Sequence, residues 1–153
     1  MDCKSVSRRS AGWLLGSLLN GLACRSDPLP FMLLADRSAC RNTVFVDVDY
    51  EKLMVNKKLV VQSTKEISDM LDHVETMPEG NPIQLRSDQY LAIGCDLKNL
   101  RKLDETLRGE VLPPQCQILC LAEVSLTYID VKSADAIISW ASKLSSGQDT
   151  HFP

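Results

Sequence analysis

Hydrophobic and polar residues follow each other along the chain in blocks typical of an α/β protein. Short apolar runs, which predict strands, alternate with segments in which apolar residues recur every three or four positions, which predict helices. The predicted strands are Thr43–Val48, Gln89–Cys95 and Gln117–Ala122, and the predicted helices are Tyr50–Leu71, Lys98–Leu107 and Ser133–Leu144. Parallel neighbours need long connections, so this alternation predicts a mainly parallel sheet with helices on both faces.

Two breaks in the pattern refine the prediction. Polar residues at Gln62–Thr64 mark a point where the first helix is expected to break. Proline, glycine and asparagine between Pro78 and Pro82 predict a loop.

The N-terminal stretch allows two interpretations. Basic residues precede the apolar segment Ala11–Ala23, an order that is typical of a secretory signal. The segment is too short to span a membrane, and Gly12 and Gly16 interrupt it. We favour a core strand or helix with an irregular start. The chain is accordingly divided into an N-terminal segment at 1–21, a core domain at 22–145 and a C-terminal tail at 146–153.

The composition narrows the choice of compartment and ligand. The six cysteines form no CxxC pair and have no histidine partner at metal-ligand spacing, so no metal site is predicted. Cys95, Cys116 and Cys120 lie in or beside apolar runs, which favours reduced thiols and a cytoplasmic protein without a membrane segment. The 17 Lys and Arg residues are scattered and the formal net charge is −3, so this chain has no predicted basic patch for a nucleic acid.

Acidic residues follow each of the three predicted strands. Asp47 and Asp49 end the first, Asp96 follows the second, and Glu123 follows the third. The carboxyl ends of parallel strands meet at one edge, where open α/β sheets bind ligands. A carboxylate there accepts hydrogen bonds from two ribose hydroxyls, so a nucleoside ligand is predicted. Each acid taken alone also fits a solvated loop or a helix cap.

Four stretches, in order and with natural spacing over roughly residues 22–145, resemble the successive motifs of the leucine carboxyl methyltransferase family. They are DPLPF at Asp27–Phe31, VFVDVDYEKLMVNKK at Val44–Lys58, YLAIGCDLKNL at Tyr90–Leu100 and LCLAEVSLTYID at Leu119–Asp130. The resemblance implies a Rossmann-like class I core that uses S-adenosyl-L-methionine, here incomplete at both ends. It also implies that Asp49, Asp96, Leu97 and Glu123 contact the ribose, adenine and methionine portions of this cofactor, and that Tyr128, the candidate catalytic residue, lies close to the mouth of the active site.

The family has two branches with different substrates. One methylates the C-terminal leucine carboxylate of a protein phosphatase catalytic subunit, and the other methylates and methoxycarbonylates a wybutosine precursor base next to the tRNA anticodon. The run AEVSLTYIDVKSADAIISWASKLSS is more similar to the second branch. The resemblance therefore implies tRNA as the partner, with the phosphatase subunit as the alternative.

One motif departs from the family pattern. The family has a glycine-rich turn that approaches the cofactor closely, and the corresponding stretch here is Gly21–Arg25, with Ala23 at the cofactor-binding position. Because Arg25 places a long side chain where the family has glycine, Arg25→Gly combined with Ala23→Gly is expected to raise cofactor affinity. The departure also supports an alternative of another class, a catalytically inactive truncated remnant or interaction module, while a small secreted protein is a third interpretation.

Overall fold

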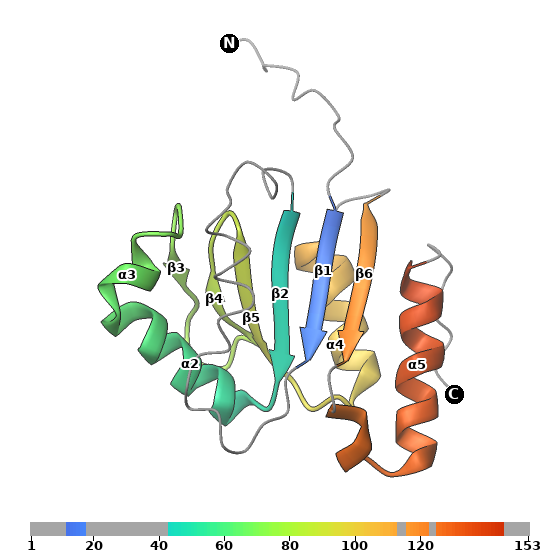
Figure 1. Cartoon of the computed structure of the whole chain (residues 1–153). Coiled ribbons are helices and arrows are strands. Elements are labelled where there is room, and N and C mark those ends of the chain that lie inside the picture. The colour runs from blue at the N-terminus through green and yellow to red at the C-terminus, as the bar shows by residue number, and fades with distance from the viewer. Residues whose placement is uncertain (1–11, 18–42, 113–115, 123–124, 146–153) are drawn as a thin grey trace.

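The structure is a computed structural model that describes residues 12–17, 43–112, 116–122 and 125–145. Its strands form one six-stranded sheet in the order β3-β4-β5-β2-β1-β6 (Figure 1). The strands are β1 (Gly12–Ser17), β2 (Thr43–Asp49), β3 (Glu75–Thr76), β4 (Ile83–Arg86), β5 (Tyr90–Gly94) and β6 (Gln117–Ala122). The predicted α/β class is observed.

Four neighbouring strands, β5, β2, β1 and β6, run parallel. The three strands predicted from the sequence are therefore parallel members of one sheet. The prediction of a mainly parallel sheet is corrected, because β4 pairs antiparallel with β5 and β3 pairs antiparallel with β4, which makes the sheet mixed. The physical reason is the short connection at 87–89, which is too tight for anything but a hairpin. Ser87 closes it: its N–H donates to the Tyr90 carbonyl (2.8 Å) and its Oγ accepts from the Tyr90 N–H (2.9 Å).

The helices lie close to their predicted positions. They are α2 (Glu51–Ser63), α3 (Lys65–Ser68), α4 (Leu100–Thr106), which continues as a π-helical turn over Leu107–Val111, and α5 (Val131–Ser145). The expected break in the first helix falls at Thr64, whose backbone is extended. The start of α5 differs from the prediction. Asp130, rather than Ser133, caps this helix, because its Oδ1 accepts the Ser133 N–H at 3.0 Å.

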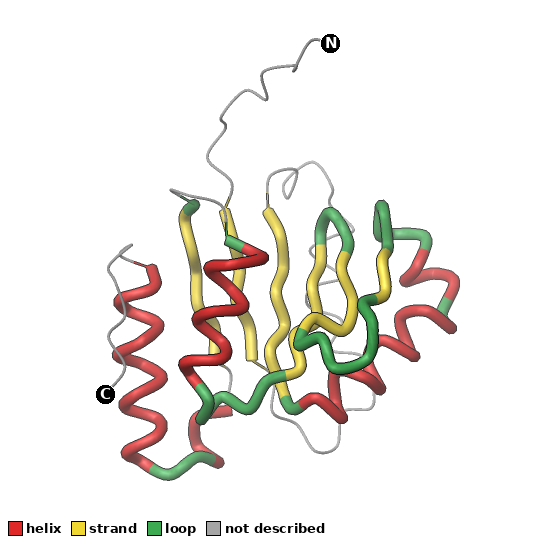
Figure 2. Tube along the Cα trace, turned by 180° about the vertical axis from the view of Figure 1, so that it is seen from behind, coloured by secondary structure: helices red, strands yellow, loops and turns green. Residues whose placement is uncertain are grey.

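The two faces of the sheet carry separate apolar cores. Along β2, Val46 and Val48 point to the face covered by α4 and α5, whereas Phe45 belongs to the cluster beneath α2. This alternation follows from the two-residue period of a strand. Figure 2, seen from behind, shows α4 across the sheet on the face opposite α2. Helices thus cover both faces, as the sequence predicts.

A buried acid joins the two helices on the α4 side. Asp104 of α4 is 6% exposed and accepts a hydrogen bond from Trp140 Nε1 of α5 at 2.8 Å. Arg108 Nε donates to both oxygens of the same carboxylate, at 3.1 and 3.0 Å. A charged side chain at this depth is compatible with folding because it is paired and hydrogen-bonded.

Trp140→Phe is expected to lower the free energy of unfolding by about 1.5 kcal/mol, the usual contribution of a hydrogen bond to a charged group. The ring remains in the core while the Asp104 carboxylate loses one donor. Equilibrium urea unfolding measures the change. Tyr128→Phe, at a side chain that is 72% exposed, is the control, with an expected change within about 0.5 kcal/mol. Equal stabilities of the two variants would contradict this role of Asp104.

Candidate functional site

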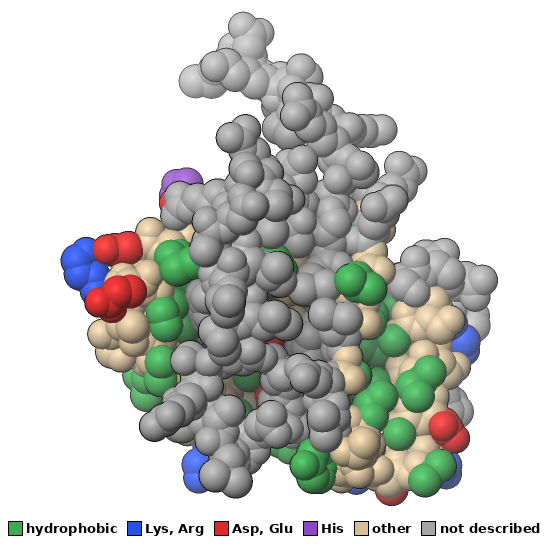
Figure 3. Space-filling model, viewed as in Figure 1, with side chains coloured by type: hydrophobic (Ala, Val, Ile, Leu, Met, Phe, Trp, Pro, Cys, Tyr) green, Lys and Arg blue, Asp and Glu red, His purple; other side chains and the backbone are tan. Residues whose placement is uncertain are grey.

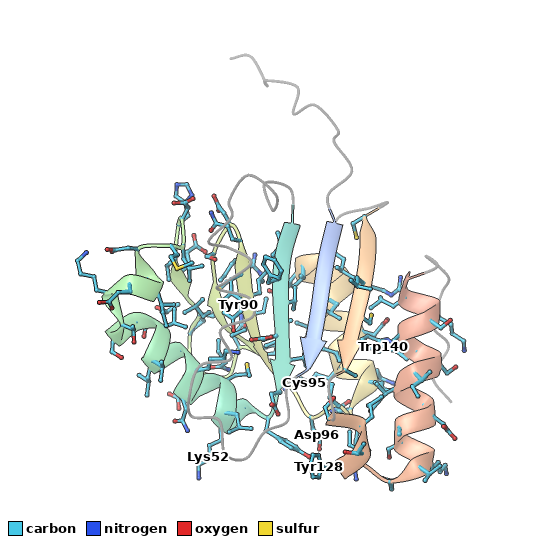
Figure 4. The ribbon with its side chains drawn as sticks, in the orientation of Figure 1. Lys52, Tyr90, Cys95, Asp96, Tyr128 and Trp140 are labelled. Atoms are coloured by element: carbon cyan, nitrogen blue, oxygen red, sulfur yellow. The ribbon has the colours of Figure 1, made fainter. Side chains whose placement is uncertain are left out.

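The carboxyl ends of β2 and β5 meet at one edge of the sheet. Asp49, the last residue of β2, is in register with Gly94, the last residue of β5. The Cys95 N–H donates to the Asp49 carbonyl at 2.8 Å and extends the pairing by one residue. Asp49 and Asp96, which lie far apart in sequence, are thereby placed at the same edge. Figure 4 shows Asp96 and Tyr128 below the strand ends at this edge.

Asp49 is the buried acid of this edge. The residue is only 3% exposed, and its Oδ1 accepts the Tyr50 N–H at 2.7 Å. Burial raises the pKa of the Asp49 carboxyl to about 6, and the charge of Asp47 adds to the increase, while the Tyr50 N–H and Lys57 oppose it. Asp49 therefore changes its charge close to neutral pH, and a ligand that donates hydrogen bonds to the carboxylate stabilises the ionised form.

The position of α2 over this edge depends on Gly94. A Cβ atom at Gly94 would lie 2.8 Å from the Glu51 Cα and 3.2 Å from the Glu51 Cβ. Only a residue without a side chain allows the first turn of α2 to approach β5 this closely. The start of α2, which follows Asp49 and Tyr50 directly, is thus held against the end of β5.

Asp96 and Leu97 occupy different environments although they are adjacent. Asp96 is exposed, and its Oδ1 accepts the Lys98 N–H at 2.9 Å, so part of its role is to close the turn before α4. Leu97 is 8% exposed, and its side chain packs in the core beneath α4 and α5. A ligand at this edge would therefore meet the main chain of Leu97 rather than its side chain.

The candidate catalytic residue Tyr128 lies on a neighbouring segment. It ends the 3₁₀ turn Ser125–Tyr128, and its side chain is 72% exposed. A salt bridge of 3.1 Å between Lys98 Nζ and Asp130 Oδ2 ties this segment to the turn that contains Asp96. The Ser133 N–H and hydroxyl, followed by Lys98, lower the pKa of Asp130 to about 2. Asp130 thus remains ionised at neutral pH and can pair with Lys98 there.

Asp47 differs from Asp49 in having a fixed set of side-chain partners. Its Oδ2 accepts the Tyr90 hydroxyl at 2.8 Å and forms a salt bridge with Lys57 of α2. Figure 4 shows Tyr90 on the side of the sheet that α2 covers. By its place at the end of a predicted strand, Asp47 is grouped with the ligand-facing acids, and its pairing with Lys57 was not predicted. The helical spacing could have indicated that Lys57 faces the sheet, since it lies on one stripe of α2 with the buried Met54 and Val61.

Several predictions concern residues outside the described part of the chain. Ala23, Arg25 and Glu123, together with the DPLPF motif, belong to this group, and their roles stay predictions. The division of the chain at residue 21 also stays a prediction. Within the assigned N-terminal segment, β1 (Gly12–Ser17) pairs with both β2 and β6 and so belongs to the sheet.

The face shown in Figure 3 carries Lys and Arg side chains of the described residues at separate points rather than in a patch. Two of the ion pairs among the described residues are Lys65 with Asp69 and Arg86 with Glu110. Among the same residues, no three His, Cys, Asp or Glu side chains are grouped as a metal site requires. None of the described helices is both long and apolar enough to cross a membrane.

Proteins from several fungi are similar to most of the chain. A protein of Aspergillus oryzae named tRNA wybutosine-synthesizing protein 4 is 63% identical over 126 residues, which are 82% of this chain and 12% of that protein. Proteins of the same name from Aspergillus fumigatus and Candida albicans are 62% and 32% identical, over 86% of this chain and 12% and 19% of their own length. No protein-family model matches the chain.

This chain is homologous to one segment of the tRNA wybutosine-synthesizing proteins. Identity above 60% over more than 120 residues confirms the resemblance to the wybutosine-synthesising branch that the four motifs predict. The names of the relatives favour this branch over the one that modifies protein phosphatases. The chain spans only 12% of the length of the Aspergillus relatives, so it corresponds to a small part of those proteins.

Proposed function

We propose that this chain carries part of the cofactor site of an S-adenosyl-L-methionine-dependent methyltransferase that acts in tRNA wybutosine synthesis. The observation that supports this most is the buried carboxylate of Asp49 at the carboxyl edge of the parallel strands, beside the turn that contains Asp96. The similarity to proteins named for wybutosine synthesis supports the pathway. We also propose a cytoplasmic location, as the cysteine pattern favours.

The chemistry of Asp49 fits the ribose of this cofactor. Its Oδ1 is engaged by the Tyr50 N–H, and among the described residues no donor is assigned to Oδ2, which suits it to accept ligand hydroxyls. Asp96 and the main chain of Leu97 follow at the same edge, where we assign the adenine. Glu123 and Ala23 complete the proposed set, with Tyr128 near the transferred group. When bound, the cofactor supplies a methyl group on a sulfonium, and the residues act by holding both reactants in line.

The tRNA partner is also part of the proposal. Because the face shown in Figure 3 gathers no basic patch among the described residues, we assign most of the RNA contact to other parts of the full-length protein. The exposed Tyr128 gives this segment a flat ring near the proposed site, which suits stacking on an unpaired base.

Isothermal titration of the chain with S-adenosyl-L-methionine at pH 8 tests the cofactor assignment. Heat of binding is expected, and Asp49→Asn should weaken the affinity about ten-fold or more, because ribose hydroxyls lose a charged acceptor. Asp88→Asn is the matched control. Asp88 is an exposed acid near the amino end of β5, where it pairs with His73, and its substitution should leave the affinity unchanged. Absence of heat at millimolar cofactor would favour the inactive interaction module instead.

The affinity is also expected to depend on pH. The Asp49 pKa is raised to about 6 in the ligand-free chain, and hydroxyl donors stabilise the carboxylate, so binding should release a proton below this pH. The affinity should therefore rise between pH 5 and pH 7 and level off above. Titrations in buffers of different ionisation enthalpy measure the proton release. The Asp49→Asn variant should lose this pH dependence. If the variant keeps it in full, the pH dependence of the affinity comes from another group.

A further inference from the structure

A largely buried cluster of three side chains lies beneath α2, and its acid, Asp47, is two residues from Asp49 on β2. Asp47 of β2 is 4% exposed, Lys57 of α2 pairs with its Oδ2, and the Tyr90 hydroxyl of β5 donates to the same oxygen at 2.8 Å. The Lys57 Nζ also lies 5.8 Å from the centre of the Tyr90 ring. Three different elements thus contribute to one hydrogen-bonded unit.

The cluster is directly coupled to the proposed ribose acid. Asp47 and Asp49 are two residues apart on β2, so their side chains leave the same face of the sheet. Two buried carboxylates at this spacing repel each other, and without a cation one of them takes up a proton near neutral pH. The charge of Asp47 raises the pKa of Asp49 and that of Lys57 lowers it, as their positions beside it would lead one to expect. Among the described residues, the hydrogen bonds to Asp49 outside the strand pairing come from the Tyr50 N–H at Oδ1 and from the Cys95 N–H at its carbonyl.

We propose that Lys57 is a positioning residue of the cofactor site: by neutralising Asp47 it keeps Asp49 ionised and free to accept the hydroxyls of a ribose. This inference rests on the proposed function. It assigns different tasks to two acids that look equivalent in the sequence. Asp47 anchors α2 to the sheet through Lys57 and Tyr90, and Asp49 faces the ligand.

The contribution of charge can be separated from that of structure. Tyr90→Phe removes the other donor to Asp47 without changing any charge. If Lys57 merely held α2 in place, Tyr90→Phe and Lys57→Met would change the pKa of Asp49 by comparable amounts. If Lys57 acts by its charge, Lys57→Arg should leave the pKa of Asp49 as it is in the unchanged chain, and Tyr90→Phe should change it only slightly. The double variant Asp47→Asn with Lys57→Met removes both charges. Asp49 should then titrate close to where it does in the unchanged chain, because the repulsion from Asp47 disappears together with the cation that balances it.

The test compares Lys57→Met with Lys57→Arg and with Lys58→Met, which alters the adjacent lysine of the same helix. The first readout is the titration of the Asp49 carboxyl carbon by NMR in the ligand-free chain. The second is the affinity for S-adenosyl-L-methionine at pH 6 and pH 8. Lys57→Met is expected to move the Asp49 titration to higher pH by about one unit, and therefore to weaken binding about five-fold at pH 6 and hardly at all at pH 8. Lys57→Arg and Lys58→Met should resemble the unchanged chain.

The two readouts distinguish the inference from the proposed function. An Asp49 titration that is the same in Lys57→Met and in the unchanged chain would overturn the role of Lys57, whatever the cofactor does. If the titration shifts but the chain never binds the cofactor, the coupling between Lys57 and Asp49 is established. The proposed function and the cofactor role assigned to Lys57 are then overturned. Should Lys57→Met fail to fold, Asp47→Asn tests the same coupling from the other side, and the Asp49 titration should then move to lower pH. An unmoved titration in that variant would also overturn the inference.

Discussion

Asp49→Asn is expected to gain about 2 kcal/mol of folding stability, relative to the unchanged chain, as the pH rises from 4 to 8. The pKa of Asp49 is about 6 in the folded chain, against an ordinary value of 3.8. Between these two values the unfolded chain has released the proton that the folded chain still holds, so the unchanged chain loses stability as the pH rises. Above about pH 7 both states are ionised and the loss is nearly complete. Asparagine does not ionise, so the variant is spared this loss.

Urea unfolding of both proteins at a series of pH values measures the effect, because contributions from other groups largely cancel in the difference. Asp130→Asn provides a control of opposite sign. The pKa of Asp130 is lowered to about 2, so its ionised form favours the folded state above pH 4, and its removal should reduce stability there rather than increase it. A difference between Asp49→Asn and the unchanged chain that stays constant with pH would show that Asp49 is well solvated. In that case the edge would hold no buried acid to bind a ligand.

Gly94→Ala is expected to lower the free energy of unfolding by about 2–3 kcal/mol, a large cost for one methyl group. The added Cβ would lie 2.8 Å from the Cα of Glu51, a backbone atom that cannot rotate away. The start of α2 must therefore move from the end of β5, and Asp49 and Tyr50 move with it. The cofactor affinity should fall together with the stability.

Gly109→Ala is the matched control for this substitution. Gly109 lies in the π-helical turn after α4, and a Cβ there would have no heavy atom within 4 Å. In a helical segment alanine is favoured over glycine, so this variant should be as stable as the unchanged chain or more stable by up to about 1 kcal/mol. If the two alanine variants have equal stability, α2 is not packed against β5 as described.

The elements that the sequence predicts well are those specified by local periodicity. Strands β2, β5 and β6 and helix α5 lie within two residues of their predicted bounds, and the break in the first helix falls at Thr64 as expected. The hairpin of β4 and β5 was not predicted. The run Ile83–Arg86 is short and follows a loop rich in proline and glycine, so it becomes a strand only through pairing with β5.

The candidate site was predictable in its location but not in its internal organisation. The rule that parallel strand ends share an edge brings Asp49 and Asp96 together from sequence alone. The rule does not tell a buried acid from one that closes a turn, nor does it place the side chain of Leu97 in the core. These differences depend on what packs above each residue.

The sequence by itself determined the alternation of strands and helices, the acids at the ends of the strands and the similarity to one branch of methyltransferases. Only the tertiary structure decided that the sheet is mixed, that Asp47 pairs with Lys57 and Tyr90, and that Asp49 is buried beside them. The reason is that strand direction, burial and charge pairing depend on contacts between distant residues, such as Asp47 and Tyr90, which are 43 positions apart. Periodicity and motifs record the neighbours of a residue along the chain, whereas the charge state of Asp49 depends on its neighbours in space.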